Sequence, residues 1–528
     1  MRLFIKKYAD FSLWLLFTAL ATFVLFFISA DSYFNDLHTR ADSAWFFMCG
    51  KAWMNGLVPY VDFADSKGPL LWLIYGIGYL LNHTSYVGVY WISCLWYGLT
   101  YLFIYKTANI FLKDSRKALV CTFLMTPIFF NPWFHNEIRA EDFCLLFLVV
   151  SLYWTCRLMY GNPENGKTLR WAFFALGACF AALLLIKFNV AAMQIVFILC
   201  ALYWLLREKK NLLKPFLHGL GGFVAVVLPF LVYFLFAGNF SAFIQEYFIT
   251  TLQTVGEAPP NDTNILLAQV VTDNPLIIFL LEWGDLIYCP ELAALLLGLM
   301  LGGILFWRSS QRYKWMPLLA SVSIFVLAIR HHFMYYFNSC SFLLIFLVTG
   351  IILLFEKPLP KRVVPATAVL AASVIILFHT LVFNFKILFF NDNINQRDYY
   401  KIAHVMAQVD TPKLINAYGH ECGFGLPAGT LPAGKYWAKQ NGFTDGMLEE
   451  HNELILSGKA DFIVIHERAF TTPGRVTEEQ LTGAGYRECL RFGEGLDFIL
   501  LTKREDLDIP DSIPLSHKDL FLKKSLFK

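Results

Sequence analysis

The sequence predicts an all-α polytopic membrane domain followed by a C-terminal α/β domain. Of the 528 residues, 57% are apolar and only 16% are charged, a composition too hydrophobic for a soluble protein of this size. Apolar runs of about 20 residues, long enough to cross a bilayer, recur through the first three quarters of the chain. The rest has the polarity of a soluble domain. We therefore expect a membrane domain at 1–385 and a second domain at 386–528.

The distribution of lysine and arginine over the loops predicts which side of the membrane each loop faces, because positively charged loops stay in the cytoplasm. Alternate loops hold twenty of these residues, whereas the segments between them hold six. We therefore expect about eleven crossings, a cytoplasmic N-terminus and an outer C-terminal domain, with outer loops at 31–85, 131–142 and 238–291. The crossings are expected near 11–30, 86–106, 118–133, 143–160, 171–187, 189–206, 216–236, 288–307, 315–330, 335–355 and 363–385.

The apolar run at 70–81 is an exception to this alternation. It is too short to span a bilayer and is predicted to form an interfacial or re-entrant helix of the first outer loop. If the run crossed the membrane, the basic cluster around Lys113 and Lys117 would face outward and break the charge rule.

The C-terminal domain is predicted to be α/β. A helix is expected at 396–408, and the short runs KLINAY, DFIVIH and DFILLT are rich in strand formers and separated by Gly and Pro clusters. Cys422 and Cys489 would be able to pair in an oxidising compartment, and two unpaired buried thiols are the alternative.

Cations on the outer side are few, so each raises the question of an anionic ligand. Lys67 follows Asp62 and Asp65 and precedes the short apolar run, a position suited to a lipid phosphate. The alternative is a lysine that pairs with Asp65 and extends to the interface. Arg330, followed by His331, ends a predicted span and would either bind the same phosphate or anchor the helix end.

Acids are the other candidates for chemistry. Asp42 lies just beyond the first span, beside Trp and Phe residues that would partly desolvate its carboxyl group, or it caps the helix that follows. Glu141 and Asp142 begin a span, where acids also favour the helix dipole whether or not they are catalytic.

Several classes of site are absent from the sequence. It contains no Walker-type phosphate loop, no dinucleotide fingerprint and no Gly-x-Ser-x-Gly elbow. The adjacent His331 and His332 have no Cys or His partner at metal-site spacing. The positive charge is spread over short loops, so no nucleic-acid partner is expected.

The first outer loop carries a pattern that resembles a known superfamily. Asp42 is followed by a segment of the type G-x-x-P-Y-x-D…K-x-P. Together with the first span, the short helix and the outer domain, it resembles the GT-C glycosyltransferases. Within them it is similar to the bacterial branch related to protein O-mannosyltransferases and the lipid A aminoarabinose transferase. The matching residues are Gly56, Pro59, Tyr60, Asp62, Lys67 and Pro69.

The resemblance implies a bacterial inner-membrane enzyme that moves a sugar from a polyprenyl-phosphate donor to an acceptor hydroxyl on a lipid, glycan or protein, with inversion. Asp42 would be the general base, either Glu141 or Asp142 the second-loop acid, and Lys67 the ligand of the donor phosphate. Some members use a divalent ion, which the three acids would hold if they converge. Here Ser43 stands where a second acid is common, which weakens a protein-mannosylating assignment.

Tyr60, Asp62 and Asp65 are expected to support the first loop. Two other functions compete with glycosyl transfer. A polymerase or ligase of lipid-linked glycans would show the same features. A transporter or flippase would show broken helices in paired repeats and polar residues at the membrane midplane, whereas this chain concentrates its acids at one surface.

Overall fold

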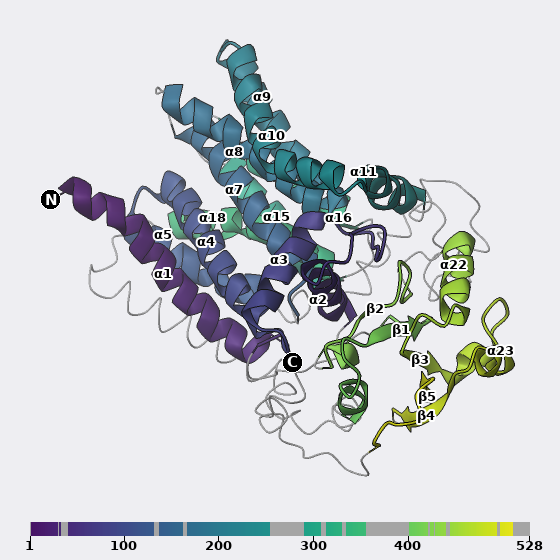
Figure 1. The fold of residues 1–528 in the computed structure, drawn as a ribbon. Coiled ribbons are helices and arrows are strands. Elements are labelled where there is room, and N and C mark those ends of the chain that lie inside the picture. The colour runs from purple at the N-terminus through teal and green to yellow at the C-terminus, as the bar shows by residue number, and fades with distance from the viewer. Residues whose placement is uncertain are drawn as a thin grey trace, which may run out of the picture. The chain divides into compact units, whose positions relative to one another are not determined.

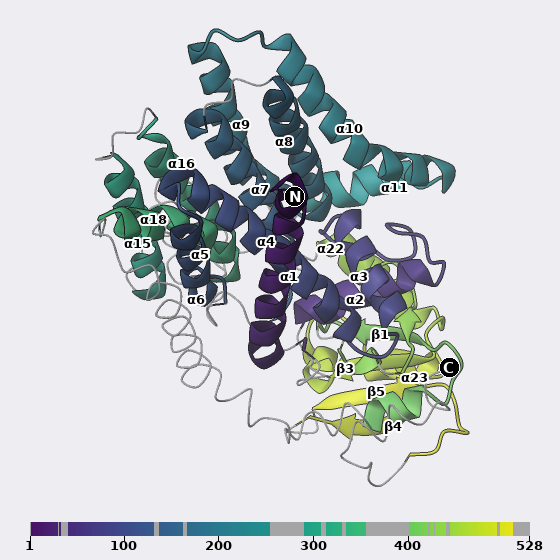
Figure 2. The ribbon, with the colours of Figure 1, turned by 90° about the vertical axis from the view of Figure 1, so that its left-hand side faces the viewer.

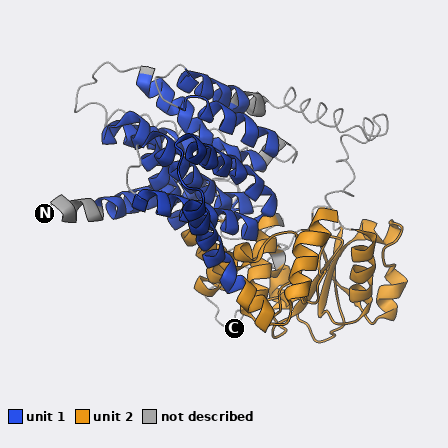
Figure 3. Cartoon of the chain, turned by 90° about the horizontal axis from the view of Figure 1, so that it is seen from above, with its two compact units in different colours: residues 1–29, 93–230, 260–386 blue, residues 30–92, 231–259, 387–528 orange. Residues whose placement is uncertain are grey.

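The computed structural model divides the chain into two compact units (Figure 3). Unit 1 comprises residues 1–29, 93–230 and 260–386, and unit 2 comprises 30–92, 231–259 and 387–528. The described residues are 2–29, 31–32, 41–130, 137–161, 166–253, 290–307, 313–329, 334–354, 401–420, 423–426, 428–439, 444–493 and 497–509.

Unit 1 is helical throughout its described part (Figures 1 and 2). In a bilayer only helices and closed barrels satisfy every backbone polar group, which explains why these apolar runs fold as helices. The helices α7, α8 and α9 pack against one another, and α15 packs against α16 and α18. The elements are α1 (Arg2–Ile28), α4 (Val87–Leu112, which begins in unit 2), α5 (Ser115–Leu124), α6 (Thr126–Phe129), α7 (Ala140–Tyr160), α8 (Gly166–Ile186), α9 (Phe188–Arg207), α10 (Leu213–Phe236, which ends in unit 2), α15 (Pro290–Trp307), α16 (Met316–Ile329), α17 (Asn338–Ser341) and α18 (Ile345–Leu354).

Six of the described helices are long and apolar enough to cross a membrane, namely α1, α4, α7, α8, α9 and α10. Shorter apolar helices lie at three further predicted crossings, within α15, α16 and 338–353. The predicted crossing at 363–385 lies outside the described residues. A polytopic helical domain is therefore confirmed, while the number eleven stays a prediction.

The predicted span at 118–133 is interrupted. Asp114 caps α5 by accepting hydrogen bonds from the backbone N–H groups of Arg116 and Lys117, and α5 ends before Met125. Pro127 then opens the four-residue α6. Proline has no N–H to donate to the preceding turn, so one continuous helix is not formed here.

Close helix packing in unit 1 depends on glycine. A Cβ on Gly177 of α8 would collide with the backbone carbonyl of Gly219 of α10. Small residues of this kind let membrane helices approach backbone to backbone, where apolar burial gives little driving force for association.

Unit 2 joins three separate parts of the chain. The first loop contributes α2 (Ala41–Met54) and α3 (Pro69–Leu81), which pack on each other. Residues 231–259 contribute the end of α10, then α11 (Phe240–Phe243) and the π-helix η1 (Ile244–Thr250). The third part is the C-terminal domain. A short helix was expected at 70–81, and α3 is that helix; its interfacial or re-entrant position stays a prediction.

The C-terminal domain contains a five-stranded sheet of order β2-β1-β3-β5-β4. The first three strands in that order are parallel, and β5 and β4 add antiparallel pairs. Buried aliphatic side chains of β1, β3 and β5 form its core together with Ile455 and Leu481. The elements are β1 (Lys413–Ala417), β2 (Leu431–Pro432), α22 (Asp445–Leu456), β3 (Phe462–His466), α23 (Glu478–Gly483), β4 (Arg487–Phe492) and β5 (Phe498–Thr502).

The α/β character expected for this domain is present, and three of the strands coincide with KLINAY, DFIVIH and DFILLT. Residues 401–406 are helical, and 396–400 lie outside the described residues. Cys489 is a free thiol, and Cys422, for which pairing with Cys489 was one of two alternatives, lies outside the described residues.

Candidate active site

Asp42 lies in the first turn of α2 and is half-buried. Positions three and four residues apart share one face of a helix, so Asp42 faces the same way as Trp45 and Phe46. Phe46 packs on Tyr75 of α3, with ring centroids 5.6 Å apart. The carboxyl group of Asp42 therefore lies on a helix face that is lined by buried aromatic rings.

Lys67 reaches this same face of α2. Its ammonium Nζ lies 5.8 Å from the centroid of the Phe46 ring, and it donates a hydrogen bond of 2.9 Å to the hydroxyl of Ser66. The nearest oxygen of Asp65 is 4.0 Å away, at the limit of an ion pair. Lys67 is thus mostly buried, with 15% of its side chain exposed, and its charge is only weakly compensated by Asp65.

Asp65 is buried, and its two oxygens differ. Oδ1 accepts hydrogen bonds from the backbone N–H and the hydroxyl of Ser66. Oδ2 has no hydrogen-bond partner among the described residues. This arrangement places an incompletely satisfied carboxylate beside Lys67, so Asp65 supports the turn before Lys67 rather than neutralising it.

Tyr60 holds the loop through its backbone and its hydroxyl. Its φ of 67° is in the left-handed region, and its N–H donates to the carbonyl of Phe63 at 2.7 Å. Its hydroxyl donates to the carbonyl of Lys67 at 3.1 Å. Burial raises the pKa of Tyr60 well above its ordinary value, so this donor keeps its proton. Asp62 closes the start of the loop by accepting from the N–H of Val58 at 2.7 Å.

Lys51 of α2 is a buried amine that the sequence reasoning did not single out. Only 2% of its surface is exposed, and its Nζ has no hydrogen-bond partner among the described residues. Burial lowers the pKa of Lys51 to about 7, because the charged form loses its hydration. The available signal was a lysine within the apolar run WFFMCGKAWM.

Glu246 of the π-helix η1 connects two parts of unit 2. Its carboxylate accepts a hydrogen bond of 2.9 Å from the hydroxyl of Tyr436 and forms an ion pair of 2.6 Å with Lys435. The carbonyl of Lys435 also accepts from the N–H of Ala64 in the first loop at 3.2 Å. Short π-helical segments are frequent at functional sites. Sequence reasoning missed Glu246, although an acid in the aromatic stretch FIQEYF was visible.

The acids of the second predicted loop lie in unit 1, at the start of α7. Glu141 forms a buried ion pair with Lys187, whose ammonium also lies 3.8 Å from the centroid of the Tyr336 ring. Lys187 precedes α9, so the pair links the starts of α7 and α9. The charge of the buried Lys187 is therefore compensated.

The carboxylate of Asp142 accepts three hydrogen bonds. It accepts hydrogen bonds from the Tyr97 hydroxyl at 2.5 Å, the Asn338 amide at 3.0 Å and the backbone N–H of Arg139 at 2.8 Å. The side chain of Arg139 pairs with Glu137, with an N–O distance of 2.5 Å. The second-loop acids thus belong to a connected buried network.

The structure gathers the predicted site residues into two groups. Those of the first loop lie together in unit 2, and the second-loop acids lie together in unit 1. Arg330 and His331 lie outside the described residues. No group of three or more His, Cys, Asp or Glu residues in the described ranges could hold a metal ion. A divalent ion held by Asp42, Glu141 and Asp142 stays a prediction.

Comparison with known proteins finds a family model and solved structures that match the chain. Residues 66–233, less than half of the chain, match the family model described as dolichyl-phosphate-mannose-protein mannosyltransferase. In structure the chain is similar to ArnT from Cupriavidus metallidurans crystallised with undecaprenyl phosphate, at 13% identity and a TM-score of 0.58 over 94% of this chain and 99% of that chain. The chain resembles the GT-C glycosyltransferases.

The same ArnT in its apo state matches at 14% identity and a TM-score of 0.57, over 93% of this chain and 97% of that chain. No curated protein sequence matches the chain. The GT-C resemblance expected from the first loop is thereby confirmed, and the fold is that of a multi-pass membrane protein. At such low identity the fold is what the two ArnT structures establish, so the role of each residue depends on its own geometry.

Proposed function

We propose that this GT-C protein transfers a sugar from a polyprenyl-phosphate donor to an acceptor hydroxyl at the outer face of a bacterial inner membrane. The observation that carries the proposal is the first loop. A half-buried acid, Asp42, and an incompletely paired cation, Lys67, share the aromatic face of α2. This reaction requires two groups: a carboxylate that takes the proton of the acceptor hydroxyl, and a cation that binds the phosphate of the donor.

In this reaction the carboxylate of Asp42 accepts the proton of the acceptor hydroxyl as the oxygen attacks the anomeric carbon. The bond from that carbon to the phosphate oxygen breaks, and the polyprenyl phosphate leaves with the electron pair. Lys67 stabilises the charge that appears on the departing phosphate. Attack opposite the leaving group inverts the anomeric configuration. A phosphate leaves without a strong acid to protonate it, so one base and one cation are sufficient.

We propose that either Glu141 or Asp142 is the second-loop acid of this reaction, as the resemblance implies. Their network fixes the start of α7 through Lys187, Tyr97 and Asn338. Such a network holds charge in one position in a low-dielectric environment, which is the property required of a group that orients a substrate.

The proposed topology places the C-terminal domain outside the cytoplasm. Its Lys435 and Tyr436 contact Glu246, and its His420 stacks on Trp45 of α2, with ring centroids 5.3 Å apart. Segments that touch must lie on one side of the membrane, so the domain, the first loop and the segment after α10 share a compartment. A reporter enzyme that is active only in the periplasm, fused after Lys528, should be active, and activity of a cytoplasmic reporter there would contradict the topology.

The test of the base uses purified protein in lipid nanodiscs with a radiolabelled sugar on undecaprenyl phosphate. Asp42→Asn should reduce transfer by about 10²–10⁴-fold, the usual contribution of a general base. Asp10→Asn is the matched control, because Asp10 is an exposed acid that pairs with Lys106. Unchanged product formation by the Asp42 variant would remove the catalytic assignment. NMR of the product's anomeric proton tests inversion.

The test of Lys67 is donor binding. Lys67→Ala should weaken binding of undecaprenyl phosphate by roughly 10–100-fold, because a hydrogen bond to a charged group contributes about 1.5–3 kcal/mol. Lys106→Ala instead removes a partly exposed cation that pairs with Asp10, and it should leave the affinity as it is. Equal affinities of wild type and the Lys67 variant would assign this lysine to loop structure.

A further inference from the structure

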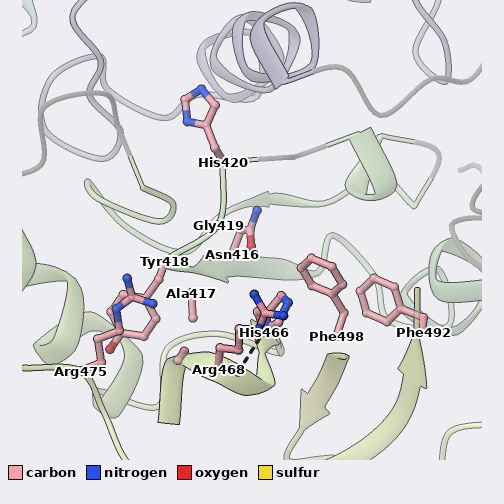
Figure 4. Close-up of a pocket in the computed structure, with 11 residues that line it drawn as sticks. Asn416, Ala417, Tyr418, Gly419, His420, His466, Arg468, Arg475, Phe492 and Phe498 are labelled. Atoms are coloured by element: carbon pink, nitrogen blue, oxygen red, sulfur yellow. Dashed lines mark hydrogen bonds between the residues drawn. The ribbon is translucent and has the colours of Figure 1, made fainter. Parts of the chain in front are cut away.

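A cavity of about 400 Å³ lies in the C-terminal domain, where β1 and β3 end (Figure 4). Asn416, Ala417 and His466 line it from the carboxyl ends of these two parallel strands. The strand order β2-β1-β3 changes direction at this pair. In open α/β sheets, ligands bind outside the carboxyl ends of the strands at such a switch point. Small-molecule sites have volumes of roughly 300–1,000 Å³, which includes this cavity.

The polar lining of the cavity is cationic. Its charged or titratable side chains include two arginines and two histidines, and none of its eleven lining residues is an acid. Neither Arg468 nor Arg475 forms an ion pair with a described carboxylate. His466 accepts the backbone N–H of Arg468 at its Nδ1, at 3.1 Å, which leaves its Nε2 to donate. An anion in the cavity would therefore meet several donors and no repulsive charge.

The walls of the cavity are aromatic. Phe492 and Phe498 stack on one side with centroids 5.3 Å apart, and the His466 ring meets Phe498 edge to face at 4.8 Å (Figure 4). On the other side the guanidinium of Arg475 lies 4.7 Å from the centroid of Tyr418. The carbon-bound hydrogens of a sugar ring make an apolar face that packs well on such rings, while its hydroxyls bind the donors around them.

The arrangement around Tyr418 is held in place before any ligand binds. Its φ of 58° is left-handed, and its N–H donates to Nε2 of His451 at 3.1 Å. Its hydroxyl accepts from the N–H of Val476 at 2.9 Å and donates to Asn452 at 2.5 Å. Side chains locked by such bonds lose little entropy on binding, which favours affinity for a small ligand.

One end of the cavity reaches the helix that carries the proposed base. His420, which Figure 4 shows apart from the other lining residues, stacks on Trp45 with an interplanar angle of 21°. Trp45 also stacks on Trp437, with centroids 5.2 Å apart. Trp45 follows Asp42 by three residues on the same face of α2. A molecule bound in the cavity thus lies beside the segment that is proposed to activate the acceptor.

We propose that this cavity binds a sugar that carries an anionic group, a phosphate or a carboxylate, and that this sugar belongs to the acceptor. The proposal rests on the proposed function, because it assigns the acceptor to that same reaction. Arg468 and Arg475 bind the anionic group, Phe492 and Phe498 pack against the sugar ring, and His420 directs the bound acceptor toward α2.

Binding by the full-length protein in nanodiscs, measured by calorimetry, tests the site without requiring transfer. The probes are glucose 6-phosphate, glucuronate, glucose and inorganic phosphate. Both anionic sugars should bind at least tenfold more tightly than glucose, and one of the two more tightly than the other, which identifies the source of the anion. Inorganic phosphate should bind more weakly than glucose 6-phosphate. Equal affinities for these last two would overturn the saccharide part of the proposal.

Variants locate the binding. Arg468→Ala and Arg475→Ala should each weaken binding of the preferred anionic sugar by roughly tenfold or more, the effect of one lost charged hydrogen bond. Arg487→Ala is the matched control. Arg487 is an exposed arginine of the same domain that begins β4 and pairs with Glu505. Arg468→Lys and Arg475→Lys keep the charge and should bind with an affinity between those of wild type and the alanine variants. They serve as the test if the alanine variants fail to fold. Unchanged affinity in both lysine variants and both alanine variants would place the anion elsewhere.

Phe498→Ala separates the sugar from the anion. It should weaken glucose 6-phosphate binding and leave that of inorganic phosphate unchanged. A proportional loss of both would mean that the aromatic wall has only a structural role.

The two proposals fail in different ways. If Asp42→Asn transfers sugar normally while the arginine variants lose binding, the site exists and the catalytic assignment is wrong. If wild type transfers sugar but the anionic sugars neither bind nor compete with acceptor, the acceptor proposal is wrong and the transferase remains.

Discussion

The two groups of predicted site residues differ in how their charges are satisfied. In unit 1, Glu141 pairs with Lys187, Glu137 pairs with Arg139, and Asp142 accepts three hydrogen bonds. In the first loop of unit 2, Lys51 has a buried Nζ without a described partner, and Asp65 has such an oxygen. Glu141, Asp142 and Asp65 were predicted from the sequence as candidates, but Lys51 was not.

This difference separates two roles for buried charge. A buried polar group that is fully bonded fixes the structure around it, whereas an unbonded one costs roughly 1–3 kcal/mol. Proteins keep such costs at sites where a ligand or a reaction uses the group. The bonds of Glu141 and Asp142 therefore fix the start of α7, whereas the first loop contains the incompletely bonded groups.

The largest expected effect on stability concerns the buried ion pair of Glu141 and Lys187. Lys187→Met leaves the carboxylate of Glu141 buried without its partner and should lower the free energy of unfolding by about 3–5 kcal/mol. Combining it with Glu141→Gln removes both charges and should recover most of this loss. Thermal unfolding in detergent micelles measures both variants. A single variant as stable as wild type would show that the pair is not a structural element.

His451 in unit 2 is a buried titratable group whose two ring nitrogens are both hydrogen-bonded and which is held neutral. Its Nδ1 donates to the carbonyl of Tyr436 at 2.5 Å and its Nε2 accepts from the N–H of Tyr418. Burial lowers the pKa of His451 from 6.5 to about 4. The unfolded chain therefore binds the proton first, and folding stability is lost as pH falls from about 6.5 to 4, by roughly 3 kcal/mol.

Thermal unfolding of the C-terminal domain within the full-length protein, measured between pH 7 and pH 4 at intervals of about one pH unit, tests this prediction for His451. His451→Gln should unfold at lower temperature at pH 7 and lose most of the pH dependence in this window. A wild-type profile that stays level down to pH 4 contradicts the neutral, doubly bonded histidine.

Lys51→Met tests the unpaired group. The pKa of Lys51 is lowered to about 7 from 10.5, so the unfolded state binds the extra proton and the cost of burying this lysine grows as pH falls from 10.5 to 7. At neutral pH the methionine variant should be more stable by about 2 kcal/mol, since it removes a buried unbonded amine. Denaturation at pH 7 and pH 10 measures this, and the gain should shrink at the higher pH.

A destabilised Lys51→Met would show that the amine has a bonding partner in the folded protein. Lys459→Met, which replaces an exposed lysine of the C-terminal domain, is the control and should change stability little.

The smallest expected effect concerns the contact between Glu246 and the C-terminal domain. Glu246→Gln should cost about 1 kcal/mol, because the neutral amide still accepts from Tyr436 but loses the charge that pairs with Lys435. Protease sensitivity of the domain in native membranes reports the loss. Glu450→Gln is the control, since Glu450 is exposed and 3.7 Å from Lys435. Equal sensitivity of the two variants would make this contact incidental.

The sequence by itself determined the elements that depend on local pattern. Apolar length predicted most of the membrane helices and the short α3, and strand propensity predicted β1, β3 and β5 almost to the residue. It missed β2, which has only two residues, and β4, whose alternating charges RECLRF hide an edge strand. It also placed a span at 118–133, where α5 ends at Leu124 and α6 begins at Thr126.

Only the tertiary structure decided which charges are satisfied and which surfaces meet. Lys187 lies 46 positions from Glu141, and Glu246 lies 190 positions from Tyr436, so no local rule links them. The cationic cavity is likewise assembled from the ends of β1 and β3 and from the turns that follow them. Periodicity and composition report how one segment meets solvent or lipid, whereas a hydrogen bond or an ion pair depends on where two distant segments come to lie.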